Sequence, residues 1–366
     1  MNILLVTLFS LERNTSVAIS NLSITKGLLA LGHRITWVMP NWAQCETLFD
    51  ASMVRVIRIP GQDQKRNVGF IRNRIRSHFR FLDFTRPYLH QIKKTLVPEE
   101  YYDIVISTSD PKTSHVFTLH LLRRINYGRW IQHWGDPLFG DITRNLWWPK
   151  LYIRLYEWSI LRKADRIIYV TPFTCDFQKE IHPKIAHKIT FIPLPADMFE
   201  TKSIQQTDVL RIAYLGDYNP TFRNLRPLYD ACANMDGVYL TIAGHGPMFT
   251  ARPNICILPR IPQSQALEIE NEADVIICVC NLHGTQIPGK ALYKASSDKH
   301  ILIAIENNRH DEMRKYFESY NRFVVCDNTK ESIGSAIQSL RSKTHNYATP
   351  EQLLPISVAK EILQLN

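Results

Sequence analysis

The hydrophobic positions in the first half of the chain form short continuous runs that alternate with helically spaced stretches. Residues 3–8 are an unbroken apolar run of strand length, and residues 17–31 carry apolar side chains at the spacing of one helix face. We expect Gly32 to end that helix, because glycine adopts a positive φ there without strain. Continuous apolar strands separated by helices indicate a parallel sheet covered on both faces. The further strands expected in this half are residues 35–39, 103–107, 130–133 and 166–170.

The second half of the chain repeats this plan. Strands are expected at 210–215, 239–243, 274–279, 301–305 and 323–326, and helices near 222–234, 263–273, 288–297, 310–320 and 329–342. This pattern predicts an α/β fold with two doubly wound, Rossmann-like domains facing a central cleft at the carboxyl ends of the strands. We expect a first domain at 1–195, a Pro-containing polar linker at 196–208 and a second domain at 209–345. A tail at 346–366 is expected to be helical in part and to return to the first domain.

Composition narrows the class of protein. The 366 residues are 45% hydrophobic and 21% charged, which suits two globular cores. No apolar run reaches the roughly 18 residues of a transmembrane helix. The apolar start has no basic residue before Ile3 and no small-residue cleavage site, so we interpret it as a buried strand and not a signal peptide. Seven cysteines without a CxxC pair fit neither a disulfide framework nor a zinc site, and a reducing cytoplasm is expected.

The positive charge is confined to the first half. Residues 1–200 hold 27 Lys and Arg against 17 Asp and Glu, whereas residues 201–366 hold 17 of each. Within 65–94, an apolar stripe at helical spacing is flanked by basic residues, as in a helix that lies on a membrane. The stripe is Ile71, Ile75, Phe79 and Leu82, and the flanking residues are Arg72, Arg74, Arg76 and Arg80. This segment predicts docking on an anionic membrane surface, at the inner face of the membrane; a helix packed on the domain core with a solvated basic face is the alternative.

The sharpest local motif is the segment 284–290, Gly-Thr-Gln-Ile-Pro-Gly-Lys, between an expected strand and an expected helix. Pro288 suits a first helical turn, and Gly289 lets the backbone approach a ligand. Free N–H groups at a helix start favour an anion, and Lys290 adds a positive charge. A diphosphate is therefore the expected ligand. The alternative is an ordinary strand-to-helix turn with a solvated lysine.

Two further loops are expected at the same edge of the second domain. Gly216 follows the first strand and is succeeded by Arg223, whose guanidinium could bind phosphate oxygens at two points. Gly244 follows the next strand. A surface arginine is the alternative interpretation of Arg223. In the first domain, His133 and Asp136 follow a strand and could line the cleft, with a structural histidine and a helix-capping aspartate as the alternative.

Six segments, in this order along the chain, resemble motifs of the GT-B glycosyltransferases of the large retaining family 4, especially those that build bacterial surface polysaccharides. The matching segments are 30–36, ALGHRIT; 129–137, RWIQHWGDP; 161–171, LRKADRIIYVT; 189–193, ITFIP; 212–225, which contains IAYLG and RNL; and 285–302, which begins TQIPGK. This chain departs from the family where its paired glutamates would stand, since Thr285 and Tyr293 occupy those positions. Asp217 replaces the basic residue often found after the glycine of the fifth motif.

The resemblance implies a glycosyltransferase that moves a sugar from a nucleotide-diphosphate donor, expected to be a UDP-sugar, to a saccharide or lipid-linked acceptor. It implies that Lys290 and Arg223 neutralise the diphosphate and that His133 contacts the transferring sugar. It places Asn14, Thr15 and Asp136 on the acceptor side, and no metal or other cofactor is expected. The donor-binding residues that it implies are Gly216, Gly244, Thr285, Gln286, Ile287, Pro288, Gly289 and Tyr293.

Two other functions remain open at this point. A GT-B-like binding or regulatory subunit without turnover would have the same fold. The basic isoelectric point, about 9.2, also suggests a nucleic-acid binder, but the confinement of the charge to one half and the expected two-domain cleft argue against it. No nucleic-acid partner is therefore expected.

Overall fold

The structure is a computed structural model of the chain. It describes residues 1–8, 16–40, 49–60, 81–83, 85–95, 97–142, 148–197, 208–341 and 347–364. The predicted acceptor-side residues Asn14 and Thr15 and the predicted membrane-contact residues Arg72, Arg74, Arg76 and Arg80 lie outside these ranges.

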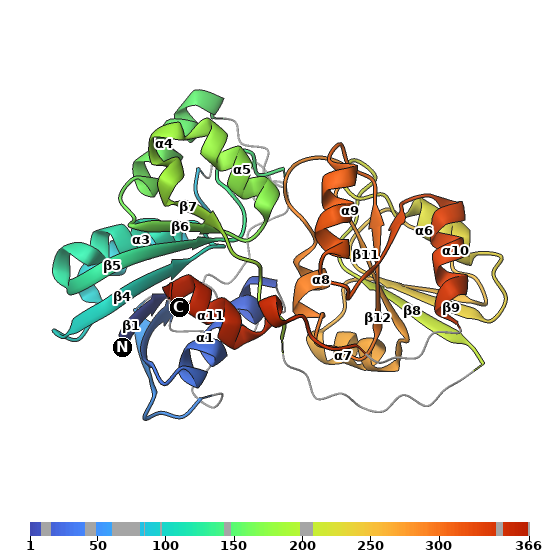
Figure 1. The fold of residues 1–366 in the computed structure, drawn as a ribbon, viewed down its shortest axis with the longest axis horizontal. Helices are drawn as coiled ribbons and strands as arrows, with labels where there is room; N and C mark the ends of the chain where they lie inside the picture. The colour runs from blue at the N-terminus through green and yellow to red at the C-terminus, as the bar shows by residue number, and fades with distance from the viewer. Residues whose placement is uncertain are drawn as a thin grey trace. The chain divides into compact units, whose positions relative to one another are not determined.

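The chain divides into two units, each built from one parallel sheet with helices on both faces (Figure 1). Unit 1 consists of Met1–Leu194 and Pro355–Asn366, and unit 2 consists of Pro195–Leu354. The chain therefore leaves unit 1 once and returns to it from Pro355 onward. The predicted α/β class with two parallel sheets is confirmed.

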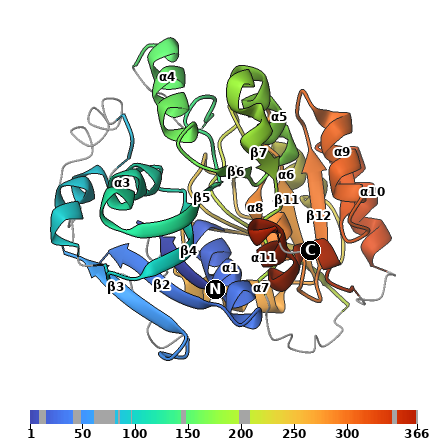
Figure 2. The same cartoon turned by 60° about the vertical axis from the view of Figure 1, so that its left-hand side comes forward.

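The described part of unit 1 contains seven parallel strands in the order β3-β2-β1-β4-β5-β6-β7, so that β3 lies at one edge (Figure 2). The order reverses between β1 and β4, which are neighbours. Connections on the two sides of such a point run in opposite directions, and ligands of doubly wound sheets bind there, at the carboxyl ends of the strands. The strands are β1 (Asn2–Val6), β2 (Arg34–Pro40), β3 (Val54–Ile59), β4 (Tyr101–Thr108), β5 (Asn126–Trp134), β6 (Arg166–Tyr169) and β7 (Ile189–Phe191).

Both faces of this sheet are buried, because successive side chains of a strand point to opposite sides. One face carries Ile3, Leu5 and Ile106 and packs against α1 (Ser16–Ala30) and α11 (Pro355–Leu363). Gly32 follows α1 with φ of 75°, as expected of the residue that ends this helix. The elements on the opposite face are α3 (Thr113–Leu121), α4 (Lys150–Leu161), α5 (Pro172–Ile181), η2 (Arg86–Lys94), η3 (Leu122–Arg124) and η4 (Pro183–Lys188).

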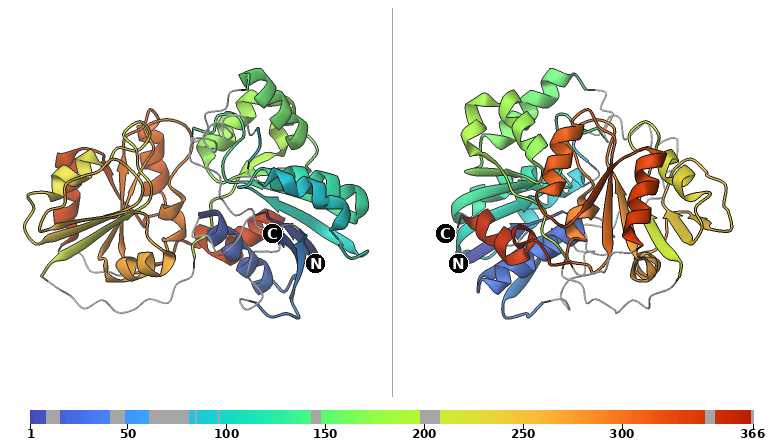
Figure 3. Two further views of the ribbon diagram at one scale, coloured as in Figure 1. Left: turned by 180° about the vertical axis from the view of Figure 1, so that it is seen from behind. Right: turned by 45° about the vertical axis from the view of Figure 1, so that its right-hand side comes forward.

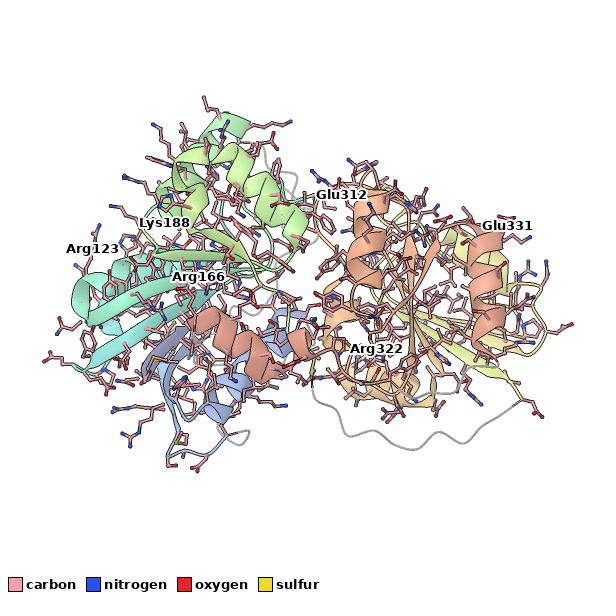
Figure 4. All side chains as sticks on the ribbon, in the orientation of Figure 1. Arg123, Arg166, Lys188, Glu312, Arg322 and Glu331 are labelled. Carbon is pink, nitrogen blue, oxygen red and sulfur yellow. The ribbon has the colours of Figure 1, made fainter. Side chains whose placement is uncertain are left out.

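Helix α11 is an integral part of unit 1. A Cβ at Gly27 of α1 would lie 2.1 Å from the carbonyl oxygen of Pro355, so only glycine permits this close packing of the two helices. The side chain of Arg166, labelled in Figure 4, donates a hydrogen bond to the carbonyl of Ile362 at 3.0 Å. Ile362 and Leu363 are fully buried in the same core as β1. Residues 355–363 therefore complete the core on this face of the sheet.

Among its described residues, unit 2 contains six parallel strands in the order β10-β9-β8-β11-β12-β13. Helices α6 and α10 lie on one side of this sheet, and α8 and α9 lie on the other (Figures 1 and 3). The strands are β8 (Leu210–Leu215), β9 (Val238–Ala243), β10 (Ile255–Leu258), β11 (Val275–Val279), β12 (His300–Ile305) and β13 (Val324–Asp327). The helices are α6 (Arg226–Cys232), α7 (Gln263–Glu272), α8 (Gly289–Tyr293), α9 (His310–Glu318), α10 (Lys330–Leu340) and η5 (Glu351–Leu353).

All ten strands expected from the sequence are present, with ends that shift by up to four residues. Three described strands, β3, β7 and β10, were not expected. Each of the three lies at an edge of its sheet. An edge strand has a neighbour on only one side, so its hydrophobic pattern is weaker than that of a central strand.

Candidate functional site

Two predicted donor-binding glycines meet at the carboxyl edge of the unit 2 sheet. Gly216 follows β8 and Gly244 follows β9, and the N–H of Gly216 donates to the carbonyl of Ala243 at 2.9 Å. A Cβ at Gly244 would lie 2.0 Å from the carbonyl oxygen of Gly216. A Cβ at Gly216 would meet nothing closer than the Tyr214 hydroxyl, at 3.7 Å. The backbone packing therefore requires glycine at 244 but not at 216.

Arg223 joins the loop after β8 to the residues that follow β11. Its Nη2 donates to Oδ1 of Asn281 at 2.8 Å, and its Nη1 donates to the carbonyl of Asp217 at 3.2 Å. Its Nε–H is buried and has no hydrogen-bond partner within the described part of the chain. These contacts orient the guanidinium and leave its buried Nε–H unused. They differ from those of a freely solvated surface arginine.

The segment 284–289 lies in the connection between β11 and α8 and ends on the first residue of that helix, Gly289. Gly284 has a φ of 84°, a conformation that favours glycine. The side-chain amide of Asn281 donates to the carbonyl of Gln286 at 3.3 Å, so Asn281 contacts both this segment and Arg223. Of the predicted donor-binding residues here, Thr285, Gln286 and Tyr293 are buried, and Ile287, Pro288 and Gly289 are partly exposed.

The helix expected at 288–297 is shorter than predicted. Helix α8 ends at Tyr293, and Pro288 is the residue before it, with extended backbone, and not part of its first turn. The physical reason is Arg322, a buried side chain that donates to three carbonyl oxygens of the following turn. Its partners are Ala295 at 2.7 Å, Ser297 at 2.7 Å and Lys299 at 2.9 Å. These contacts favour a turn over further helix.

Lys290 is paired with a carboxylate that the sequence analysis did not identify. Its Nζ lies 2.9 Å from Oε1 of Glu270, a buried residue of α7. The other carboxylate oxygen, Oε2, lies 2.6 Å from Nζ of Lys294, which is also buried. One carboxylate thus bridges two ammonium groups, and this three-residue cluster carries a net positive charge.

The protonation behaviour of the cluster follows from these contacts. Burial by itself would raise the pKa of the Glu270 carboxyl, but Lys290 and Lys294 outweigh burial and lower that pKa. Burial would lower the pKa of Lys290, whereas Tyr293 and Glu270 raise it above its usual value. Burial dominates for Lys294 and lowers its pKa in spite of Glu270. Glu270 therefore holds Lys290 firmly in its charged form.

Arg223 and Lys290 both affect the pKa of the same two neighbouring groups, so they lie in one region of unit 2. Burial raises the pKa of the Cys278 thiol to about 11, and both cations oppose that rise. Burial also raises the pKa of the Tyr214 hydroxyl, and again Arg223 and Lys290 oppose it. The structure therefore brings together, at the carboxyl edge of one sheet, the two cations and the two glycines that the sequence analysis predicted.

His133 lies in β5 of unit 1 and is only 2% exposed. Its partners in register are Thr108 of β4 and Ile168 of β6. Both ring nitrogens of His133 lack a hydrogen-bond partner within the described residues. Burial lowers the pKa of its imidazole to about 4, so the ring is neutral near pH 7. A neutral imidazole has one donor and one acceptor nitrogen, and in His133 both are buried.

Other polar groups stand near the carboxyl edge of the unit 1 sheet. Asp136 is partly buried in the turn after β5. Lys112 is buried beyond β4, and its Nζ lies 2.8 Å from Oδ1 of Asp110 and 3.1 Å from Oδ2 of Asp141. The sequence analysis missed this ion cluster. Its two carboxylates are about thirty residues apart in the sequence, and only the fold brings them together.

Two kinds of feature are absent from the described residues. No group of three or more His, Cys, Asp or Glu side chains in those ranges is arranged to hold a metal ion. None of the helices there combines the length and the apolar character needed to cross a membrane.

Comparisons with known proteins identify the fold. No family model matches the chain, and no curated protein matches its sequence. HepE (Alr3699) from Anabaena, solved in complex with UDP-glucose, has a TM-score of 0.54 at 12% identity and matches over 100% of this chain and 97% of its own. OtsA, solved without ligand, has a TM-score of 0.52 at 10% identity over 99% of this chain and 96% of its own.

This likeness spans both units and concerns the fold alone. It confirms the prediction of a GT-B fold with two Rossmann-like α/β units.

Proposed function

We propose that this chain is a glycosyltransferase that moves a sugar from a nucleotide-diphosphate donor to a saccharide or lipid-linked acceptor. The observation that carries the proposal is the cationic group in unit 2, where Lys290 and Lys294 contact a single buried carboxylate, that of Glu270, and Asn281 orients the guanidinium of Arg223 in the same region. A fixed excess of positive charge beside two close-packed glycines suits the diphosphate of such a donor.

Cleavage of the bond between the sugar and the diphosphate depends mainly on this positive charge. When the bond between the sugar and the diphosphate breaks, negative charge develops on the leaving phosphate. Lys290, held in its charged form by Glu270, and the positively charged guanidinium of Arg223 can stabilise that charge without a metal ion. Both groups are already oriented by protein contacts, so they need little reorganisation during the reaction.

In this proposal the transfer proceeds with retention. A retaining enzyme of this kind needs no dedicated carboxylate base, because the leaving phosphate can accept the proton of the acceptor hydroxyl. His133 is the residue of unit 1 proposed to contact the transferring sugar. Its neutral ring and its two unpartnered nitrogens support a hydrogen-bonding role instead of that of a general acid.

A UDP-sugar is the proposed donor. HepE, whose fold this chain shares, is solved with UDP-glucose, and that supports a uridine nucleotide. The donor-binding residues proposed to surround it are those of the segment 285–289 together with Gly216, Gly244 and Tyr293. The family's ribose-binding glutamate corresponds to Tyr293 in this chain, so the ribose must be recognised differently here.

The sequence motifs of family 4 lead us to propose a role in the synthesis of surface polysaccharide. Their order along the chain supports it, and the GT-B fold over the whole chain is consistent with it. The acceptor-side residues in the proposal are Asn14, Thr15 and Asp136.

The test is a thermal-shift screen of the full chain with UDP, GDP, CMP and their sugar conjugates, because a ligand raises the unfolding midpoint by mass action. We expect a shift with UDP and with one UDP-sugar. Release of UDP from that sugar on addition of a saccharide or lipid-phosphate acceptor then measures transfer. Binding of UDP-sugar without turnover would identify a non-catalytic subunit. Absence of any shift would contradict the proposed donor site.

A further inference from the structure

A groove of about 610 Å³ runs beside β3, the edge strand of the unit 1 sheet (Figure 2). Residues 55–58 and Pro60 form one side of it, and Lys94, Val97 and Pro98 form the other. Four consecutive residues of one strand line the groove, although successive side chains point to opposite faces of a sheet. The groove therefore follows the edge of the strand instead of one face of the sheet. We call it the β3 groove. Its volume lies in the range of ligand-binding sites.

The backbone of β3 directs hydrogen-bonding groups toward this edge. Ile35 of β2 lies opposite Val54, and its N–H donates to the carbonyl of Met53 at 2.9 Å. Alternate residues of a parallel strand bond to the same neighbour, so the odd-numbered residues of β3 bond to β2 and Val56 points away from it. Within the described part of the chain, the N–H and the carbonyl of Val56 make no hydrogen bond. This edge can therefore pair with a further strand.

Both sides of the β3 groove are held in place by the rest of unit 1. Ile57 and Val97, one from each side, pack against the hydrophobic core on the η2 face of the sheet. The side chain of Arg124 donates hydrogen bonds to the carbonyls of Ile92 and Thr95, which flank the end of η2. The groove is thus formed before a ligand binds, and binding needs little reorganisation of its walls.

The charged residues that line the β3 groove are basic and come from two elements. Arg55 and Arg58 belong to β3, and Lys94 is the last residue of η2. Arg55 and Lys94 are exposed, and neither forms an ion pair with a carboxylate among the described residues. Glu99 and Glu100 follow in the sequence, but they do not belong to the lining. The groove therefore favours a ligand with negative charge.

We propose that the β3 groove binds an extended acidic peptide segment of another protein, which adds to the unit 1 sheet as a strand beside β3. Backbone hydrogen bonds with Val56 contribute affinity, as in other cases of strand addition to a sheet edge. Acidic side chains of the segment select the site by facing Arg55 and Lys94. This interaction does not depend on the donor chemistry of unit 2.

The charge of β3 argues against a second copy of this chain as the occupant. Two β3 strands side by side would bring the arginines of both copies together, and like charges on neighbouring strands destabilise the pair. Charged residues on an edge strand often serve only to prevent such pairing. That role does not account for Lys94, which lines the same groove from η2. An acidic strand is complementary to the basic residues of both elements.

Fluorescence anisotropy of the full chain with a labelled peptide tests the proposal. The probe is a capped peptide of alternating threonine and glutamate, and a second probe carries lysine in place of glutamate. We expect the glutamate peptide to bind, less strongly as salt rises, and the lysine peptide not to bind. Arg55→Gln/Lys94→Gln should weaken binding about tenfold, because two ion pairs are lost. Val56→Pro removes one N–H that β2 does not use and should weaken binding about fivefold, whereas Val56→Ala keeps that N–H and should bind like the wild type.

A matched control for charge lies elsewhere on unit 1. Arg123, labelled in Figure 4, and Lys163 are exposed and lie outside the groove, so Arg123→Gln/Lys163→Gln removes the same charge and should leave binding unchanged. Thermal unfolding checks that each variant is folded, and if Val56→Pro is not, Arg55→Gln/Lys94→Gln decides. Failure of the glutamate peptide to bind would overturn the proposal, as would equal binding of the two peptides or unchanged binding by Arg55→Gln/Lys94→Gln.

Two further outcomes would assign the β3 groove to another occupant and overturn the proposal. Displacement of the peptide by inorganic phosphate, with Val56→Pro and Val56→Ala binding the peptide equally well, would identify a site for a small anion. Self-association of the chain that Val56→Pro abolishes, without binding of the peptide, would identify a second copy.

Discussion

The ammonium nitrogen of Lys290 lies 2.9 Å from Oε1 of Glu270, so the lysine proposed for the donor diphosphate already has a carboxylate partner. The second oxygen of that carboxylate holds Lys294 at 2.6 Å. A bound diphosphate would therefore share its lysine with Glu270. The same carboxylate offsets the repulsion between the two ammonium groups before the donor arrives. This arrangement gives the two partners opposite expected effects on donor binding.

Changing Lys290 to Ala should lower transfer about a hundredfold, because removal of one preorganised contact to a developing leaving-group charge costs about 3 kcal/mol. The measurement is kcat/KM for the UDP-sugar, with circular dichroism to confirm folding. Lys330→Ala, at an exposed position on α10, is the matched control and should retain full activity. Turnover by Lys290→Ala close to that of the wild type would remove Lys290 from the proposed mechanism.

Changing Glu270 to Gln should destabilise the free protein and strengthen nucleotide binding. Without the carboxylate, two ammonium groups share a buried site, and loss of one partner from such a site costs about 3 kcal/mol. A diphosphate would replace the missing negative charge. Thermal unfolding with and without UDP measures both effects, and the stabilisation by UDP should be larger in Glu270→Gln than in the wild type. An equal or smaller stabilisation would mean that the diphosphate does not bind near Lys290.

Changing Gly244 to Ala should destabilise unit 2 by about 3 kcal/mol, since the new Cβ would meet the carbonyl oxygen of Gly216 at 2.0 Å, and neither backbone can shift freely. Gly216→Ala is the matched control. Its Cβ meets only ordinary contacts, so its stability should change by less than about 1 kcal/mol. Urea unfolding followed by tryptophan fluorescence measures the pair. Similar stabilities for the two variants would contradict the close approach of the two strand ends.

His133 should make the stability of unit 1 depend on pH. Its pKa is about 4 in the folded chain against 6.5 when unfolded, so between these values the unfolded chain binds more protons. The stabilisation is complete above pH 6.5 and decreases as pH falls toward 4, by about 3 kcal/mol in all.

His133→Gln should remove this contribution. Urea unfolding of both proteins at several pH values between 4 and 7 gives the difference, in which the titration of the carboxyl groups cancels. Parallel stability curves for the two proteins would mean that the histidine is hydrated and not buried.

The sequence predicts the central part of the fold well. The strand β11 is apolar at every position and is buried on both faces, so its pattern is recognisable without the structure. The edge strand β3 has Arg55 and Arg58 among its apolar residues, so it forms neither a continuous apolar run nor a regular alternation, and the pattern does not identify it. Helix α8 ends early because of Arg322, whose contacts come from a residue almost thirty positions away. Local pattern contains no information on such a contact.

The residues of the candidate site also differ in whether local sequence predicts them. Residues that follow parallel strands directly, or within one loop, lie at the same edge of the sheet. This rule predicts the positions of Gly216, Gly244 and Arg223. Asn281 also follows a strand and could have been found in the same way. Lys294 stands four residues after Lys290, a spacing that predicts neighbouring side chains on a helix. Glu270 gives no such signal, because it belongs to another helix and only the packing of α7 brings it to both lysines.

The packing of α11 on α1 has a consequence for how the chain folds during its synthesis. Residues 355–363 are translated after the whole of unit 2, yet they cover one face of the sheet that residues 2–6 begin. At about 5–20 residues per second, roughly 10–30 s separate the synthesis of residue 194 from that of α11. Over that interval the nascent unit 1 lacks part of its core packing, and this affects Ile3, Leu5 and Ile24. Unit 1 is thus begun first and completed last, and during translation it presents the apolar surface that chaperones bind.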